Sequence, residues 1–296
     1  MAMTRVLVTG VTGNVGYEVA KKLQEMFVDM VGAVRNIEAA RSKLGDEFTY
    51  VKLDYRSPET FIPALDGVNR IFLMFPPETD LPHFHSFIRC AKEQGIEHIV
   101  YLSVKDVQFL PFIPHYKNEK EITRQKISST FLRAGYFMQN LNMFLLDELK
   151  TNNRIYVPAG RGETSFIDVR DVAEVAALTL TEEGKHRDKK YAITGNRSLD
   201  FYDVARVMSN ILGRTITYSN PSIRDFKAYM VEIGLDESYV NAVVGVHIPT
   251  KLVLLELKRI ARIHLQGHDG RFAGYRCRSF LKRATQSGIR IRVVFL

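Results

Sequence analysis

Cysteine is scarce in this chain, and apolar runs of membrane-spanning length are missing from it. The 296 residues include two cysteines, Cys90 and Cys277, so no disulfide framework is indicated and a reducing compartment is the default. No stretch of about 18 uninterrupted apolar residues occurs, which argues against a membrane span. The first predicted strand lies too close to residue 1 to leave room for a signal peptide in the chain as written. We therefore expect a cytoplasmic protein without a membrane partner.

The spacings that mark metal centres and serine hydrolases are also missing. His83 and His85 lie on one predicted helix and His115 starts another, but no Cys-x2-Cys or His-x3-His pair occurs. No Gly-x-Ser-x-Gly elbow is present. We expect neither a metal site nor a serine hydrolase.

Acidic residues are nearly missing from residues 258–296. This tail has ten Lys or Arg residues and one acid, Asp269, which gives it a net charge of +9. The whole chain has a formal charge of +8, so the preceding 257 residues sum to −1. Nucleic acid is therefore not an expected partner of the body of the protein. The tail is either an arm for nucleic acid or another anionic surface, an extension without fixed structure, or a sequence not selected for folding.

A strand, a glycine turn and a helix open the chain. Residues 6–8 are an apolar run typical of a buried strand. Three glycines follow at G-x-x-G-x-x-G spacing: Gly10, Gly13 and Gly16. Apolar residues then recur every four positions, as on one helix face: Val15, Val19, Leu23 and Phe27. Gly10 permits a tight turn, Gly13 lets amides approach phosphates, and Gly16 allows close helix packing, so a dinucleotide site is predicted.

Predicted strands alternate with helices along most of the chain. Strands are expected at 6–8, 28–34, 48–53, 70–75, 98–103, 129–134, 154–157, 190–194 and 215–218. The main helices are expected at 81–94, 116–126, 136–149, 170–181, 199–212, 222–233 and 237–244. Ser57 and Pro58 are expected to open a short helix, with Ser57 as its cap. This order predicts an α/β fold with a doubly wound, Rossmann-type parallel sheet and a smaller, discontinuous C-terminal substrate lobe.

The same order predicts the domains. Residues 1–150 are expected to form the NAD(P)-binding domain, with segments at 154–195 partly returning to it. Residues 196–257 are expected to form a smaller, mainly helical substrate lobe, followed by the basic tail at 258–296. Helix faces in the second half would serve either a homodimer or the core of a monomer.

Residues at the strand ends refine the cofactor prediction. Arg35 follows the second predicted strand, where an arginine suits the 2′-phosphate of NADP(H). NADP(H) is therefore preferred over NAD(H), and a solvated surface arginine is the alternative. Asp54 is placed to face the adenine or to cap a loop. Pro76 and Pro77 stop the fourth strand where the chain would pass the cofactor.

Reduction of a carbonyl by hydride needs an acid that protonates the developing alkoxide. Ser103, Tyr116 and Lys120 form a Ser-x12-Tyr-x3-Lys arrangement that would suit a carbonyl reductase or epimerase. The Tyr-x3-Lys part recurs by chance in a chain with 13 tyrosines. Quinones, azo compounds and cationic dyes accept hydride with little help from an acid. These acceptors therefore become the preferred substrate class.

The sequence resembles the NmrA-like branch of atypical short-chain dehydrogenase/reductases over residues 4–257. The motifs are Thr9-Gly10-Val11-Thr12-Gly13-Asn14-Val15-Gly16, Pro114-His115-Tyr116-Lys117-x-Glu119, Phe131-Leu132-Arg133, Tyr136-Phe137-Met138-Gln139-Asn140-Leu141 and Phe166-Ile167-Asp168-Val169-Arg170-Asp171-Val172-Ala173. The branch includes quinone oxidoreductases, triphenylmethane reductase, azoreductase-like proteins and NmrA redox-sensing regulators. The resemblance implies an oxidoreductase with an aromatic or quinone acceptor. The alternative is a non-catalytic NADP(H) sensor with a regulatory protein partner.

The resemblance also implies roles for individual residues. The usual lysine position falls on His115 and the usual tyrosine on Pro111, so Tyr116 and Lys120 would match by coincidence. The implied cofactor contacts are Gly10, Thr12, Gly13, Asn14, Val15, Gly16, Arg35, Phe75, Pro76, Pro77 and Ser103. The residues implied near the nicotinamide are His115, Tyr136, Phe137 and Asn140. Members of the branch are expected to end in an acidic helix, and a shifted reading frame near Leu257 would explain the basic tail.

Overall fold

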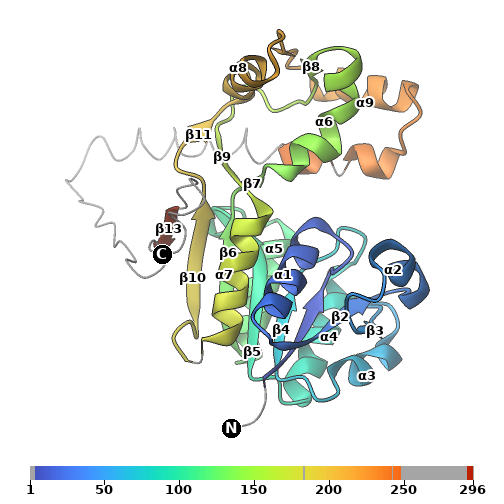
Figure 1. The fold of residues 1–296 in the computed structure, drawn as a ribbon, viewed down its shortest axis with the longest axis vertical. Coiled ribbons are helices and arrows are strands. Elements are labelled where there is room, and N and C mark those ends of the chain that lie inside the picture. The colour runs from blue at the N-terminus through green and yellow to red at the C-terminus, as the bar shows by residue number, and fades with distance from the viewer. Residues whose placement is uncertain (1–3, 183, 242, 248–291, 296) are drawn as a thin grey trace, which may run out of the picture. The chain divides into compact units, whose positions relative to one another are not determined.

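The computed structural model describes residues 4–182, 184–241, 243–247 and 292–295 (Figure 1). These residues divide into two compact units. The first contains residues 4–135 and 167–193 together with β13 (Arg292–Phe295), and the second contains residues 136–166 and 194–247. Apart from β13, the basic tail lies outside the described residues.

The first unit is built on an eight-stranded sheet with the order β13-β10-β6-β5-β4-β1-β2-β3. The strands, besides β13, are β1 (Arg5–Thr9), β2 (Asp29–Val34), β3 (Tyr50–Lys52), β4 (Arg70–Leu73), β5 (His98–Val104), β6 (Ser128–Ala134) and β10 (Lys189–Thr194). The seven strands from β10 to β3 pair in parallel. The strand order reverses between β1 and β4, which is the switch point where doubly wound sheets bind ligands. The predicted Rossmann-type sheet is confirmed.

Helices cover both faces of this sheet. They are α1 (Asn14–Glu25), α2 (Ile37–Leu44), α3 (Phe61–Leu65), α4 (Leu81–Glu93), α5 (Pro114–Arg124) and α7 (Val169–Thr181), with short 3-10 turns η1 (Pro58–Thr60) and η2 (Val107–Phe109). Helices α1 and α7 pack side by side (Figure 1). On the other face, α3, α4 and α5 bury a cluster that includes Leu7, Ile71 and Tyr101. Side chains on alternate strand positions thus face opposite helical layers.

Two local expectations were wrong. Phe27 was expected on the buried face of the first helix, but α1 ends at Glu25 and Phe27 is 97% exposed. Phe27 has a φ of +58°, and this left-handed residue turns the chain toward β2. Ser57 precedes η1 but its side chain makes no capping hydrogen bond. The turn is held from its other end, where the Thr60 hydroxyl donates to the Ser57 carbonyl over 2.7 Å.

The second unit is mainly helical. It contains α6 (Gln139–Thr151), α8 (Phe201–Leu212), α9 (Ile223–Glu232) and helical residues at 237–241 and 243–247. Its short strands are β7 (Tyr136–Phe137), β8 (Arg154–Ile155), β9 (Thr164–Ile167), β11 (Ser198–Leu199) and β12 (Thr217–Tyr218). Helix α6 starts three residues later than expected, because residues 136 and 137 form β7. Among the described helices, none is long and apolar enough to cross a membrane.

Candidate functional site

The glycine turn joins β1 to α1 at the carboxyl end of the sheet. Gly10 has a φ of +67°, and a Cβ added at Gly16 would lie 2.2 Å from the Gly10 carbonyl oxygen. Both positions therefore require glycine. Gly13 is the N-cap of α1 and provides no side-chain cap, while Asn14 is exposed and Val15 is buried behind it. No side chain caps the first amides of α1, and such uncapped amides are the donors that bind a dinucleotide pyrophosphate.

Thr9 ties this turn to the next strand across the switch point. Its hydroxyl donates to the Phe72 carbonyl over 3.0 Å and accepts from the Met74 amide over 2.8 Å. This pairing holds the end of β4 beside the glycine turn. It also sets the path of Phe75, Pro76 and Pro77, which are half-buried or exposed just beyond β4.

Two arginines, one following β2 and one following β3, both contact Glu78. Arg35 Nη1 lies 2.8 Å from Glu78 Oε2, and both side chains are about 70% exposed. Arg56 Nη2 donates to the Glu78 carbonyl over 2.8 Å. An exposed pair of this kind contributes at most about 1 kcal/mol, so a phosphate can displace the carboxylate. Sequence reasoning missed Arg56, because no local pattern links it to Arg35.

Lys43 and Asp54 complete this region. Lys43 Nζ, on α2, donates to the Thr12 carbonyl over 2.8 Å, which brings a positive charge to the glycine turn. Sequence reasoning missed Lys43 as well. The Asp54 carboxylate accepts from the Arg56 amide over 3.0 Å. Asp54 therefore caps the loop, which is one of the two roles that the sequence left open.

Ser103 is committed to a buried ion pair. Its hydroxyl donates to Glu119 Oε1 over 2.7 Å. Arg133 holds both oxygens of the same carboxylate, at 3.0 and 2.7 Å.

Tyr116 and Lys120 both lie on α5. Lys120 Nζ lies 5.6 Å from the centroid of the Tyr116 ring, so these two residues do share a helix face. Within the described residues, no hydrogen bond joins Tyr116 to Ser103.

His115 lies in the first turn of α5. Its ring meets Phe75 edge-on, with 6.2 Å between the ring centroids, and its Nδ1 lies 2.8 Å from the Tyr101 hydroxyl. Burial lowers the pKa of His115 to about 4, against a weaker opposing effect of the Glu119 carboxylate. The imidazole is therefore neutral at pH 7. Together with Phe75, it occupies the carboxyl-end side of the sheet that also carries the glycine turn.

The remaining predicted residues belong to the second unit. The Tyr136 hydroxyl donates to His247 Nε2 over 2.9 Å, and His247 Nδ1 donates to the Val243 carbonyl over 2.7 Å. Burial raises the pKa of Tyr136 and lowers that of His247 to about 4. Asn140 is buried on α6, and Phe137 is half-buried on β7. The structure thus gives the Tyr136 hydroxyl a protein partner within its own unit.

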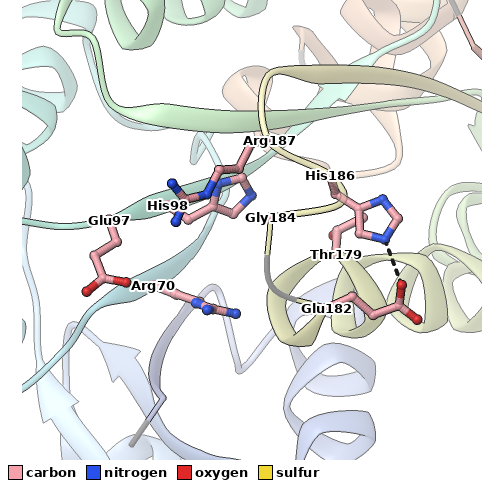
Figure 2. Close-up of a pocket in the computed structure, with 8 residues that line it drawn as sticks. All are labelled: Arg70, Glu97, His98, Thr179, Glu182, Gly184, His186 and Arg187. Carbon is pink, nitrogen blue, oxygen red and sulfur yellow. Dashed lines mark hydrogen bonds and ion pairs between the residues drawn. The ribbon is translucent and has the colours of Figure 1, made fainter. Parts of the chain in front are cut away.

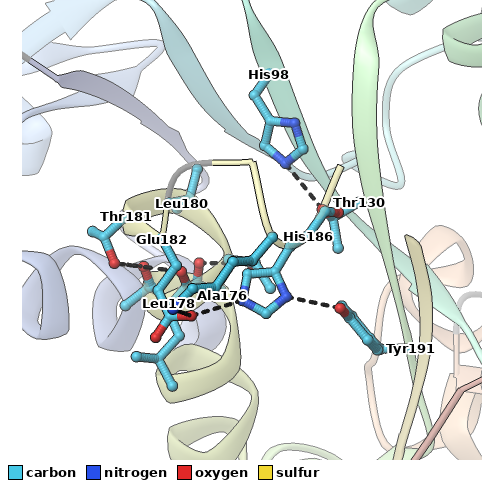
Figure 3. Close-up of polar contacts among 12 residues, drawn as sticks. His98, Thr130, Ala176, Leu178, Leu180, Thr181, Glu182, His186 and Tyr191 are labelled. Atoms are coloured by element: carbon cyan, nitrogen blue, oxygen red, sulfur yellow. Dashed lines mark hydrogen bonds and ion pairs between the residues drawn. The ribbon is translucent and has the colours of Figure 1, made fainter. Parts of the chain in front are cut away.

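A cavity lies at the opposite, amino-end edge of the sheet. Figure 2 shows the residues that line it: Arg70, Glu97, His98, Thr179, Glu182, Gly184, His186 and Arg187. Several of these groups already bond to the protein (Figure 3), because His98 Nε2 lies 2.9 Å from the Thr130 hydroxyl and His186 Nδ1 lies 2.7 Å from the Tyr191 hydroxyl. Arg70 donates to the Leu180 carbonyl at the end of α7. Such contacts stabilise the fold, and the described residues include no cluster able to hold a metal ion.

The proteins similar to this chain include named reductases. NAD(P)H azoreductase of Xenophilus azovorans is 31% identical over 244 residues, which cover 80% of this chain and 84% of the relative. The structure of an NADPH-dependent quinone oxidoreductase from Escherichia coli, complexed with NADPH, matches with a TM-score of 0.71 and 25% identity. It covers 83% of this chain and 90% of that one.

A third match concerns the fold alone. The Citrobacter sp. triphenylmethane reductase complexed with NADP(H) has a TM-score of 0.73 and 24% identity, covering 83% of this chain and 88% of that one. The sequence model of the NmrA-like family matches residues 2–247, which is most of the chain. The resemblance noted in the motifs is confirmed. This chain belongs to the NmrA-like family.

Proposed function

We propose that this NAD(P)H-dependent oxidoreductase uses NADPH to transfer hydride to quinone-like, azo or other conjugated acceptors. The observation that carries the proposal is the combination of an intact cofactor turn with a Ser103 hydroxyl already bound to Glu119. A carbonyl reductase needs an acid beside the carbonyl, and the Ser103 hydroxyl that would assist Tyr116 donates to Glu119 instead. Conjugated acceptors spread the incoming charge, so a proton from water suffices. The names of the azoreductase and quinone oxidoreductase relatives support the same class.

The residues of the first unit would bind and orient the cofactor. The first amides of α1 would hold the pyrophosphate against Gly10, Gly13 and Gly16. Arg35, joined by Arg56, would bind the 2′-phosphate and favour NADPH over NADH. The bound cofactor supplies the hydride. We keep the wider set as proposed cofactor contacts: Thr12, Asn14, Val15, Asp54, Phe75, Pro76, Pro77 and Ser103.

Four residues are proposed to lie near the acceptor: His115, Tyr136, Phe137 and Asn140. His115 is the first of them, since it is neutral and lies beside Phe75. Tyr136, Phe137 and Asn140 belong to the second unit, and the substrate-lobe role of residues 196–257 stays a prediction. Tyr116→Phe tests the carbonyl-reductase alternative, because loss of a general acid commonly lowers turnover by about 100-fold or more.

The test is NADPH oxidation by the full-length protein with a panel of quinones, azo dyes and cationic triphenylmethane dyes. Saturable, acceptor-dependent turnover that exceeds turnover with simple aldehydes is the expected result. NADPH binding without turnover of any acceptor would instead indicate a redox sensor and would overturn the proposal.

A further inference from the structure

Four side chains of the first unit form one continuous chain of hydrogen bonds. His85 Nε2, on α4, lies 2.9 Å from Asn118 Oδ1 on α5. Asn118 Nδ2 donates to the Tyr101 hydroxyl over 3.0 Å, and that hydroxyl lies 2.8 Å from His115 Nδ1. Asn118 and Tyr101 are fully buried. The contacts therefore run through the protein interior from His85 to His115.

The orientation of the Asn118 amide sets the direction of every bond in this chain. Because Asn118 Nδ2 donates to the Tyr101 oxygen, the single hydroxyl proton of Tyr101 is free to be donated onward. Its acceptor is His115 Nδ1, which must then carry no proton. A neutral imidazole has one N–H, so the proton of His115 stands on Nε2.

The surroundings of His115 keep this ring neutral and leave Nε2 available. Burial disfavours the imidazolium, and the N-terminus of α5 adds the positive end of a helix dipole. Within the described residues, His115 Nε2 has no hydrogen-bond partner, and the ring is half-buried beside Phe75. A neutral imidazole at a helix N-terminus can polarise a substrate oxygen by donating a hydrogen bond.

We propose that His115 presents its Nε2–H to an oxygen of the acceptor, and that Tyr101 and Asn118 are positioning residues that hold the proton on Nε2. This inference rests on the proposed function and narrows it to acceptors with an oxygen beside the reduced position, quinones above all. Transfer of one hydride, with its two electrons, leaves a negative charge on a quinone oxygen. The His115 N–H stabilises that charge by hydrogen bonding and keeps its proton. A proton from water then completes the hydroquinone.

The position of the proton is measurable without turnover. Full-length protein labelled with 15N-histidine is examined by NMR at pH 7, where protonated and unprotonated ring nitrogens give well-separated signals. The signal lost in His115→Gln assigns the residue. An unprotonated Nδ1 and a protonated Nε2 are expected, and Tyr101→Phe should shift the Nδ1 signal because it removes the donor. A protonated Nδ1 with a bare Nε2 would mean that the chain runs in the opposite direction and would overturn the proposal.

Kinetics test the role of that proton. A quinone gains charge on oxygen, whereas a cationic triphenylmethane dye accepts hydride at carbon and becomes neutral. His115→Leu should lower the ratio of quinone kcat to dye kcat by about tenfold or more. His115→Gln, which keeps an N–H at similar reach, should restore most of the ratio, and Tyr101→Phe should lower it about threefold. His83→Leu is the matched control, since His83 pairs with Asp80 and takes no part in the hydrogen bonds between His85 and His115.

The outcomes separate this inference from the proposed function. An unchanged quinone-to-dye ratio in His115→Leu would refute the donor role while leaving the oxidoreductase intact. Loss of turnover with both acceptors to the same extent would refute it too, since that result indicates damage common to all substrates. No turnover of any acceptor by the unaltered protein would refute the proposed function, and the NMR result alone would then decide where His115 carries its proton.

Discussion

The two edges of the parallel sheet in the first unit differ in how their polar groups are used. At the amino-end edge, Arg70, His98 and His186 gather around a cavity, yet each bonds to the protein itself. At the carboxyl-end edge, no side chain caps the start of α1, and the ion pair that Arg35 makes with Glu78 among the described residues is exposed to solvent. The amino-end edge is therefore structural, although charged side chains gather around its cavity. A cluster of charge indicates a binding site only where the fold leaves it unsatisfied.

The largest expected effect is a loss of NADPH affinity when a side chain is added inside the glycine turn at the carboxyl-end edge. Gly16→Ala places a Cβ 2.2 Å from the Gly10 carbonyl oxygen, so the turn must open. We expect NADPH affinity to fall by about 1,000-fold, which corresponds to about 4 kcal/mol. Fluorescence titration measures it. Gly245→Ala is the control, since no atom lies within 4 Å of its added Cβ. Equal affinity in the two variants would remove the glycine turn from the site.

A fall in pH should lower the free energy of unfolding through His98 at the amino-end edge. Burial, aided by Arg70, lowers the pKa of His98 to about 4, below its ordinary value of about 6.5. The unfolded chain then binds a proton that the folded chain refuses, so stability falls as pH drops from about 6.5 to 4. The contribution of His98 is at most about 3 kcal/mol.

Urea unfolding at pH 7 and pH 4.5 measures this loss. His98→Gln cannot gain the proton and should flatten the pH dependence. His115 and His247 contribute in the same direction, because burial lowers the pKa of each to about 4. A pH dependence that is identical with and without His98 would contradict a structural role for this edge.

Arg35 tests the cofactor preference of the carboxyl-end edge. Arg35→Ala removes a guanidinium whose protein partner, Glu78, is exposed. We expect NADPH affinity to fall about 20-fold, or about 2 kcal/mol, while NADH affinity changes little. Arg206→Ala, which breaks a comparable exposed pair with Asp203 in the second unit, serves as the control. Parallel losses for both cofactors would show that Arg35 does not read the 2′-phosphate.

Substitution of Asp171 gives the smallest expected change, which is a change in the free energy of unfolding. Asp171 lies in the first turn of α7, and its buried Oδ2 has no hydrogen-bond partner among the described residues. Burial, together with the Asp168 carboxylate, raises the pKa of Asp171 to about 6. The folded state therefore disfavours the charge at pH 7, and this penalty shrinks as pH falls from about 6 toward the ordinary Asp value of about 4.

Asp171→Asn should raise the free energy of unfolding by about 1 kcal/mol at pH 7 and have little effect at pH 4. Urea unfolding of the variant and the unaltered chain at both pH values measures the difference. Destabilisation at pH 7 would instead show that the Asp171 charge stabilises the folded state.

Much of the fold was predictable because its signals are local. Apolar runs and four-residue periodicity placed β1, β2, β5 and the long helices within a few residues of their observed bounds. The glycine spacing likewise reports a local requirement, since Gly10 and Gly16 approach each other across one turn. Phe27 was wrongly placed on the first helix, because α1 ends at Glu25. Periodicity does not show where a helix stops, and a left-handed backbone ended this one early.

The sequence by itself determined the parallel α/β fold, the family and the place of the cofactor turn, because each depends on residues close together in the chain. The tertiary structure decided which polar groups are already satisfied. It joined Ser103 to Glu119 and His85 to Asn118, pairs 16 and 33 residues apart, for which no spacing rule exists. It also placed Arg56 beside Glu78 and Lys43 beside Thr12. Hydrogen bonds form between groups that folding brings together, and so the partners of a candidate residue are known only once the chain has folded.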